Sequence, residues 1–152
     1  MRNSFFMSLF LISGICSPAD LSFIDPTGTY ILKGETRGNN IIGNSGELRV
    51  LLLDSQTVAI SLYLNKGYPG YESGSLLDTL HYDNNKVVYT PGIDSSCAIY
   101  FLFDRKSVEL FRTLTDPHSD CGFRPGVLKA AVYEKISSDI PVIQDLSKHG
   151  VL

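Results

Sequence analysis

The sequence predicts an all-β fold, a single antiparallel meander of about eight strands that forms a small barrel or sandwich with a short C-terminal arm. From Asp25 onward, short apolar stretches are separated by segments rich in Gly, Asn, Asp, Ser and Pro. Within the stretches the side chains alternate with a period of two, as at Val58, Ile60 and Leu62. Several of the connections are short, which favours pairing of consecutive strands.

The first element is a predicted secretory signal peptide over residues 1–19. An apolar run over 5–15 is followed by small residues at Ser17 and Ala19. The run is shorter than the ~20 residues of a membrane-spanning helix. A buried N-terminal element is the weaker alternative, because no charged residue interrupts the run to form a second face. We expect cleavage after Ala19, which leaves residues 20–152 as a single β domain.

The number of cysteines agrees with the predicted export. Removal of the leader removes Cys16 and leaves Cys97 and Cys121, which we expect to form a disulfide in an oxidising compartment. Ile15 precedes Cys16, whereas lipoprotein processing prefers a small residue there, so a lipid anchor is not expected. A metal site built on the two thiols would need a CxxC motif or nearby histidines, and only His118 lies close in sequence.

The charge of the chain restricts its partners. The formal net charge is −3, and it becomes −4 when Arg2 leaves with the leader. Basic residues are scattered without a cluster, which argues against nucleic acids and anionic membranes as partners. No second apolar segment is long enough to span a bilayer. We therefore expect a periplasmic or secreted protein with no transmembrane segment after cleavage.

The strands follow in order between turn-forming segments. They are expected at Gly28–Gly34, Glu47–Asp54, Thr57–Asn65, Ser75–Tyr82, Lys86–Thr90, Cys97–Phe103, Ser107–Thr113 and Val127–Ile136. Tight turns are expected at Asp54-Ser55-Gln56, Asp83-Asn84-Asn85 and Asp104-Arg105-Lys106. The glycine-rich segment Gly38–Gly46 is interpreted as a flexible loop.

The two ends of the meander resemble one another. Thr27–Ile31 and Ala130–Glu134 are both strand-like, so the first and last strands can pair and close a barrel. Large inward side chains such as Leu62, Phe101 and Phe103 would then fill the interior. The tail from residue 138 to 152 is expected to form one helical turn or an arm that lies on the barrel.

A glycine-rich segment at 66–75 is the strongest candidate for recognition. It carries Tyr68 and Tyr71, and tyrosines on a loop give a large contact area at low entropic cost. We predict that Tyr68, Tyr71 and Glu72 form a partner-binding loop. The alternative is a long hairpin connection whose tyrosines fold back over the end of the barrel.

Signals for catalysis are weaker. Asp116, His118 and Asp120 lie within five residues and offer acid–base or metal-binding groups, but Asp-Pro-His-Ser-Asp is also ordinary turn chemistry beside a cysteine. Asp78 stands alone on an apolar strand, where a solvent-facing role is favoured. The histidines are far apart, HExxH and GxSxG motifs are absent, and a disulfide removes both thiols as nucleophiles. We expect no catalytic residue, no metal and no cofactor.

Three segments carry a resemblance to a known family. The run Ser96–Phe103, the turn Cys121-Gly122-Phe123 and the final strand up to Lys135 resemble the layout of small secreted bacterial β-barrel proteins of the lysozyme-inhibitor-like kind. The resemblance covers the C-terminal part of the chain and includes no clear inhibitory loop. It implies a periplasmic or surface protein that binds a cell-wall hydrolase.

The sequence therefore favours a non-enzymatic binding protein with a protein partner, such as an inhibitor or immunity protein against a cell-wall hydrolase or toxin effector. An acidic domain suits this function, because many lysozymes are basic and opposite charge speeds association. The alternative is a small-ligand carrier of lipocalin-like architecture, since an eight-stranded barrel can hold one small molecule. A hydrolase would require acidic residues or histidines from separate strands to converge.

Overall fold

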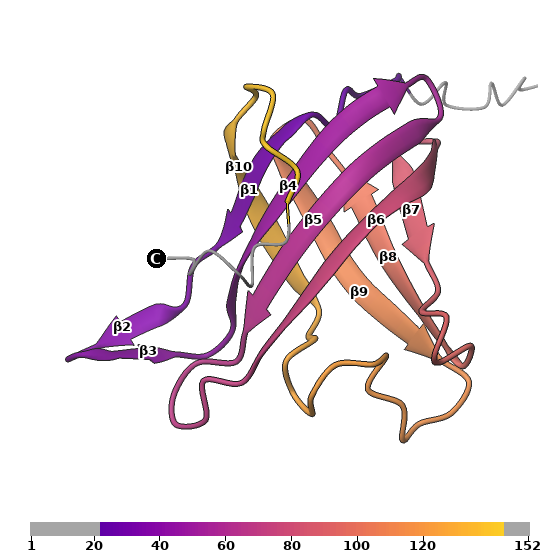
Figure 1. Cartoon of the computed structure of the whole chain (residues 1–152). Helices are drawn as coiled ribbons and strands as arrows, with labels where there is room; N and C mark the ends of the chain where they lie inside the picture. The colour runs from indigo at the N-terminus through magenta and orange to yellow at the C-terminus, as the bar shows by residue number, and fades with distance from the viewer. Residues whose placement is uncertain (1–21, 145–152) are drawn as a thin grey trace, which may run out of the picture.

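The computed structural model describes residues 22–144, which form ten β-strands (Figure 1). The strands are β1 (Gly28–Leu32), β2 (Glu35–Arg37), β3 (Asn40–Ile42), β4 (Ser45–Asp54), β5 (Thr57–Asn65), β6 (Ser73–Asp83), β7 (Lys86–Tyr89), β8 (Cys97–Phe103), β9 (Ser107–Leu114) and β10 (Ala131–Ser137). The described residues contain no helix, and so none that is long and apolar enough to cross a membrane. The predicted leader, Cys16 and the end of the predicted arm lie outside the described residues.

Eight of these strands form a closed antiparallel barrel in the order β1-β10-β9-β8-β7-β6-β5-β4, and β4 pairs with β1 to complete the ring. Tyr30 of β1 lies opposite Lys135 of β10 on one side and Leu48 of β4 on the other. The predicted pairing of the two ends of the meander is therefore confirmed, and the fold is a barrel and not a sandwich. Two predicted strands, 57–65 and 97–103, match the structure at both bounds.

The last predicted strand begins later than expected. It starts at Ala131, while Val127 and Leu128 are buried outside any strand. Asn44 fixes this approach to β10, because its side-chain amide donates to the carbonyls of Gly126 (3.0 Å) and Val127 (2.8 Å). The two apolar residues thus belong to the core without joining the ladder.

The expectation of a flexible loop over Gly38–Gly46 is wrong. β2 and β3 form a separate two-stranded sheet, and the turn between them includes Gly38 with φ +60°. An isolated hairpin is marginally stable, but this one gains a tertiary partner in the β5–β6 connection. Ile42 forms a parallel bridge with Tyr68, and the Tyr68 N–H donates to the Ile41 carbonyl (2.7 Å). That contact orders a segment whose composition suggests disorder.

Inward-facing side chains fill the barrel. Leu62, Phe101 and Phe103 point inward and are buried, as predicted. Each fully buried large apolar side chain stabilises the fold by about 1.5–3 kcal/mol. The largest fully buried residues are Tyr30, Tyr82, Tyr133, Phe101, Leu48, Ile60, Leu62, Ile99, Leu110, Val50 and Val58.

The segment before β1 covers one end of the barrel. Asn85 accepts a hydrogen bond from the Ile24 N–H (2.9 Å) and donates one to the Ser22 carbonyl (2.9 Å). The Tyr82 hydroxyl donates to the Ile24 carbonyl (2.6 Å), and the Phe23 ring packs edge-on against Tyr82. Burial, reinforced by the charge of Asp25, raises the pKa of Tyr82 to about 12. The hydrogen bonds of Ser22 and Ile24 thus attach the first described residues to the barrel.

The predicted disulfide is confirmed. Cys97 at the start of β8 is bonded to Cys121 in the β9–β10 connection, with the two Cα atoms 5.4 Å apart. Both cysteines are buried. The bond ties the long β9–β10 connection to the barrel wall.

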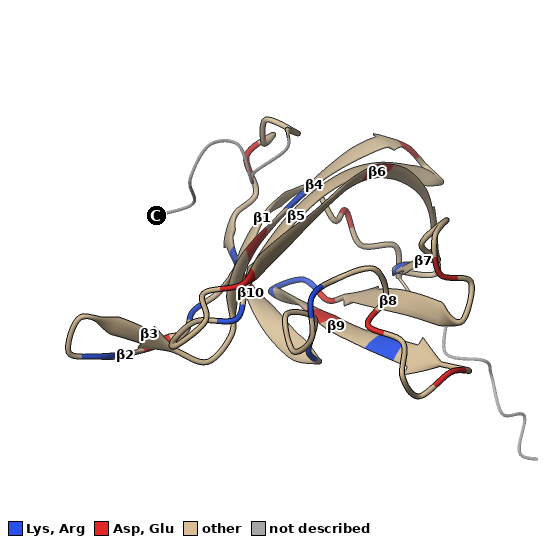
Figure 2. Cartoon of the chain, turned by 60° about the horizontal axis from the view of Figure 1, so that its bottom comes forward, with Lys and Arg blue, Asp and Glu red and all other residues tan. Residues whose placement is uncertain are grey.

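The ring has one weak junction, between β6 and β7. These strands pair only at Tyr82–Val87 and Asp83–Lys86, although β6 is 11 residues long. In Figure 2, β4, β5 and β6 form an arch that stands apart from β8 and β9 on the opposite side. Within residues 22–144, most of β6 therefore has no strand partner on the side of β7.

Candidate functional site: tyrosines beside the β2–β3 hairpin

The predicted binding loop is the β5–β6 connection, which lies beside the β2–β3 hairpin at the lower end of the molecule in Figure 1. Tyr68 is 51% exposed and Tyr71 is 42% exposed. Their rings meet edge to face, with centroids 6.4 Å apart. Both rings are therefore partly exposed to solvent, and the Tyr71 hydroxyl contacts the hairpin. We call Tyr68, Tyr71 and the adjoining Asn40 and Ile41 the tyrosine platform.

Contacts from the hairpin hold the platform in place. The Tyr68 N–H donates to the Ile41 carbonyl (2.7 Å), and the Tyr71 hydroxyl donates to the Asn40 side-chain oxygen (3.2 Å). Gly67 has φ +77°, and a Cβ at this position would collide with the backbone that follows β3. Only glycine permits so close an approach of the loop to the hairpin.

A second set of contacts closes the base of the loop. The Lys66 N–H donates to the Glu72 carbonyl (2.9 Å), and the two side chains form an ion pair of 3.0 Å. Asn65 accepts a hydrogen bond from the Gly67 N–H (2.7 Å) and donates one to the Tyr71 carbonyl (3.2 Å). Glu72, predicted as a contact residue, thus has its charge balanced by Lys66 and braces the loop.

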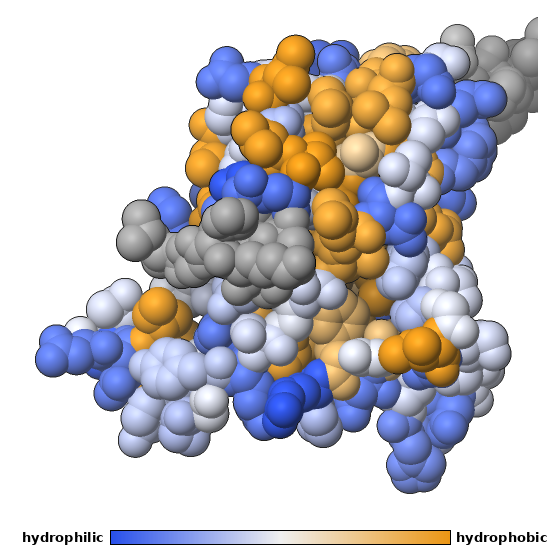
Figure 3. All heavy atoms as spheres, in the orientation of Figure 1, coloured by the Kyte–Doolittle hydropathy of each residue, from blue (hydrophilic) through white to orange (hydrophobic). Residues whose placement is uncertain are grey.

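A groove of about 440 Å³ runs between the hairpin and the barrel, beside Tyr71. Its apolar lining includes Ile31, Ile41 and Tyr63. In Figure 3 an apolar group stands out on the hairpin among hydrophilic neighbours. Sequence reasoning missed this part of the site. The one available signal was the apolar pair Ile41-Ile42 inside a Gly- and Asn-rich segment.

The surroundings of the platform carry little net charge. Glu35 and Arg37 form an exposed ion pair of 2.9 Å on β2, and Lys66 is balanced by Glu72. Lys33 lines the groove beside them. The acidity of the chain as a whole is therefore not concentrated at this surface.

The segment around His118 has the turn role that the sequence favoured. The Asp116 carboxylate accepts a hydrogen bond from the His118 N–H (2.9 Å), and Asp120 lies 3.8 Å from Arg112. Asp78 is exposed, as expected for a solvent-facing residue. Within residues 22–144, no group of three or more His, Cys, Asp or Glu side chains is arranged to hold a metal ion.

Asp94 organises the same end of the barrel, and sequence reasoning did not single it out. Its carboxylate accepts hydrogen bonds from the Ser119 hydroxyl and from both the hydroxyl (2.6 Å) and N–H (3.1 Å) of Ser96. Hydrogen bonds from Ser119 and then Ser96 lower the pKa of Asp94. Ser119 in turn accepts from the Cys121 N–H (3.1 Å), so this network supports the disulfide.

Comparison of the chain with protein families, with curated proteins and with solved structures finds no significant match. The resemblance to lysozyme-inhibitor-like proteins stays a hypothesis.

Proposed function

We propose that this chain is a periplasmic or secreted, non-enzymatic binding protein that presents the tyrosine platform to a protein partner. The observation that carries the proposal is the combination of exposure and bracing at Tyr68 and Tyr71. Both rings are about half exposed, yet the hairpin and the base of the loop fix the backbone on either side.

Bracing matters because association has an entropic cost. Ordering a mobile loop on binding opposes affinity, and a loop that is already ordered avoids much of that cost. Tyrosine also offers a large apolar ring together with a hydroxyl group, which suits the centre of an interface. The groove beside Tyr71 offers a place for an apolar side chain of the partner.

The partner that we propose is a cell-wall hydrolase or a related toxin effector, which the chain would block as an inhibitor or immunity protein. Support comes from the predicted leader, the disulfide and the layout of the C-terminal strands. The net charge of −4 after cleavage would attract a basic enzyme over long range. Because the platform itself is nearly neutral, we assign contact affinity to the tyrosines and steering to the rest of the chain.

The filled interior favours this proposal over a lipocalin-like carrier. Tyr30, Phe101 and Tyr133 are fully buried inside the ring. A carrier needs a cavity in the barrel, whereas these three side chains line neither of the described grooves.

The test is biolayer interferometry of the secreted protein against purified muramidases, amidases and toxin effectors. For a binding partner, Tyr68→Ala and Tyr71→Ala should each weaken the affinity about 30-fold, the value for a hot spot of about 2 kcal/mol. Tyr100→Ala is the matched control, because Tyr100 lies on the outer face of β8 beside Phe111. Equal affinity of the double tyrosine variant and the wild type for a verified partner would eliminate the platform as the binding surface.

A further inference from the structure

The strand β6 has an open edge. It pairs with β5 along its length, from Ser73 to His81 and beyond. On its other side, β7 joins it only at Tyr82 and Asp83, and no other described strand pairs there. Nine residues of β6 thus present one edge without a strand partner in residues 22–144.

The cause is the early end of β7. β7 is only 4 residues long and stays paired with β8 through Tyr89. Pro91 follows, and proline cannot donate to a ladder. The chain then turns, since the Asp94 N–H donates to the Pro91 carbonyl (3.0 Å). β7 therefore cannot follow β6 toward Ser73.

The orientation of the backbone identifies the groups on this edge. The Tyr82 N–H donates to the Gln56 carbonyl (2.8 Å), so even-numbered residues of β6 bond to β5. Because ladder partners alternate along an antiparallel strand, the N–H and carbonyl groups of Ser75, Leu77 and Thr79 point to the open side. The Thr79 N–H donates to the Asp78 carboxylate (2.7 Å), which occupies one edge position.

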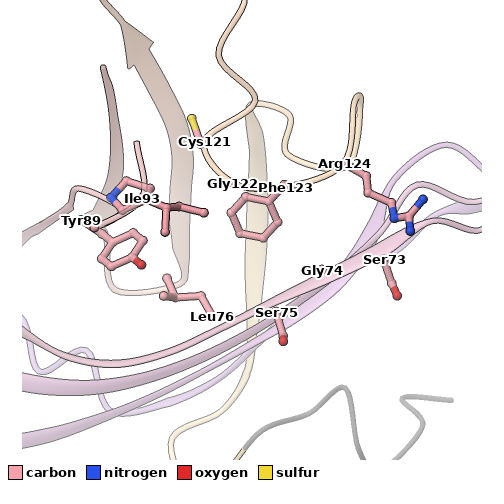
Figure 4. Close-up of a pocket in the computed structure, with 12 residues that line it drawn as sticks. Ser73, Gly74, Ser75, Leu76, Tyr89, Ile93, Cys121, Gly122, Phe123 and Arg124 are labelled. Atoms are coloured by element: carbon pink, nitrogen blue, oxygen red, sulfur yellow. The ribbon is translucent and has the colours of Figure 1, made fainter. Parts of the chain in front are cut away.

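A depression of about 490 Å³ adjoins the edge (Figure 4). β6 forms one side with Leu76, and the residues after β7 form another with Ile93, which is 85% exposed. Phe123, from the disulfide-bonded connection, sits over Gly74, where a Cβ would collide with its ring. Tyr89 completes an apolar wall. This depression shares no lining residue with the groove beside the tyrosine platform.

Asp78 gives the open side a negative charge, while Arg124 is the one charged residue among those that line the depression. It lies opposite Ile60, a core residue, so its side chain points to the inner face of the wall and yet is exposed through the opening. Burial, followed by the charge of Asp78, raises the pKa of Tyr89. Among the described residues, no cation lies within ion-pair distance of Asp78.

We propose that the open edge of β6 binds an extended peptide segment of a partner protein, which adds to the barrel as a strand. The backbone of the segment bonds to the edge groups of Ser75 and Leu77, as in β-strand addition. On the inner face, cross-strand neighbours lie side by side. A basic residue of the peptide therefore faces Asp78, and an apolar residue two positions away faces Leu76 and Phe123.

The probe is a fluorescein-labelled peptide, acetyl-TVTKTVT-amide, which places lysine between two valines on one face whichever way it runs. We expect saturable binding by anisotropy, and at least about tenfold weaker binding when lysine is replaced by glutamate. In Asp78→Lys the preference should reverse in favour of the glutamate peptide. Two further peptides are N-methylated, one at the odd-numbered amides and the other at the even-numbered amides. Their affinities should differ, because only one of these two sets of amides donates to the edge.

Leu77→Pro tests the edge directly, since the amide that it removes points away from β5 and the β5–β6 ladder stays intact. It should abolish binding, whereas the matched variant Leu77→Thr should bind as the wild type. Should Leu77→Pro fail to fold, amide shifts in the ¹⁵N spectrum of the wild type replace it, with Ser75, Leu77 and Thr79 moving on titration. Three results would overturn the proposal: no saturable binding, equal binding of both methylated peptides, or shifts confined to Tyr68 and Tyr71. Dimerisation of the wild type that Leu77→Pro abolishes would overturn it too, by showing a second copy on the edge.

Discussion

Asn85 offers a test of how the N-terminal segment is attached to the barrel. Its side chain is buried and takes part in two hydrogen bonds, accepting from the Ile24 N–H and donating to the Ser22 carbonyl. The Tyr82 hydroxyl also lies 3.1 Å from the Asn85 oxygen, but it donates its single proton to the nearer Ile24 carbonyl. Each such bond contributes about 1 kcal/mol net. Asn85→Gly keeps the turn, because φ is +58° at this position, and should reduce the free energy of unfolding by about 2 kcal/mol. Asn85→Ala should cost about 1 kcal/mol more, because alanine is strained at positive φ.

The neighbouring residue supplies the control. Asn84 also has a positive φ, +50°, but it is exposed and its side chain contacts only Asp83. Asn84→Gly should change stability by less than about 1 kcal/mol. Urea denaturation followed by tyrosine fluorescence suits a chain with no tryptophan, and hydrogen exchange at Ile24 reports the local attachment. If Asn85→Gly and Asn84→Gly had equal stability, the hydrogen bonds to the N-terminal segment would contribute nothing.

Two further predictions concern the other end of the barrel. Replacement of Cys97 and Cys121 by alanine should lower the free energy of unfolding by about 3.5 kcal/mol, the chain-entropy value for the loop that they close. A loss below about 1 kcal/mol in urea denaturation would contradict the chain-entropy explanation. Hydrogen bonds lower the pKa of Asp94 in the folded state, so its contribution is present above the unfolded pKa of about 3.9 and is lost as the pH falls below it. The Asp94→Asn variant should therefore lose less stability than the wild type between pH 6 and pH 3, and parallel curves of urea midpoint against pH would refute this.

The barrel strands could be predicted because their signal is local. Val58, Ile60 and Leu62 alternate with smaller or polar residues, and a period of two assigns them to one face of a strand regardless of their neighbours. The turn at Asn84-Asn85 could likewise be predicted from the sequence. Asn is among the few residues that tolerate positive φ at both central positions of a hairpin turn. Closure also followed from a local property, the strand-like character of both ends.

The site was only partly predictable because it depends on contacts between distant segments. Tyr68 and Tyr71 could be selected by residue type, but the side-chain oxygen of Asn40 that holds Tyr71 lies 31 positions away. Apart from the apolar pair Ile41-Ile42, the composition of the hairpin does not indicate order. The hairpin is held by contacts between its backbone and the β5–β6 connection. The open edge of β6 was hidden for a related reason. Pro91 marks the end of β7 in the sequence, but the length of β6 left unpaired depends on the three-dimensional register.

An open strand edge normally invites two copies of a chain to pair, and Asp78 opposes that outcome here. If β6 met a second β6 in antiparallel register around residue 78, two Asp78 carboxylates would lie opposite one another, and like charges in that position are destabilising. A register centred on Leu77 would instead place each Asp78 beside Leu76 of the other copy, where the carboxylate loses water without gaining a cation. A foreign strand that carries a lysine avoids both costs. The same carboxylate therefore discourages self-association and selects a basic segment, so that Asp78→Asn should increase dimerisation at high concentration while it weakens binding of the lysine peptide.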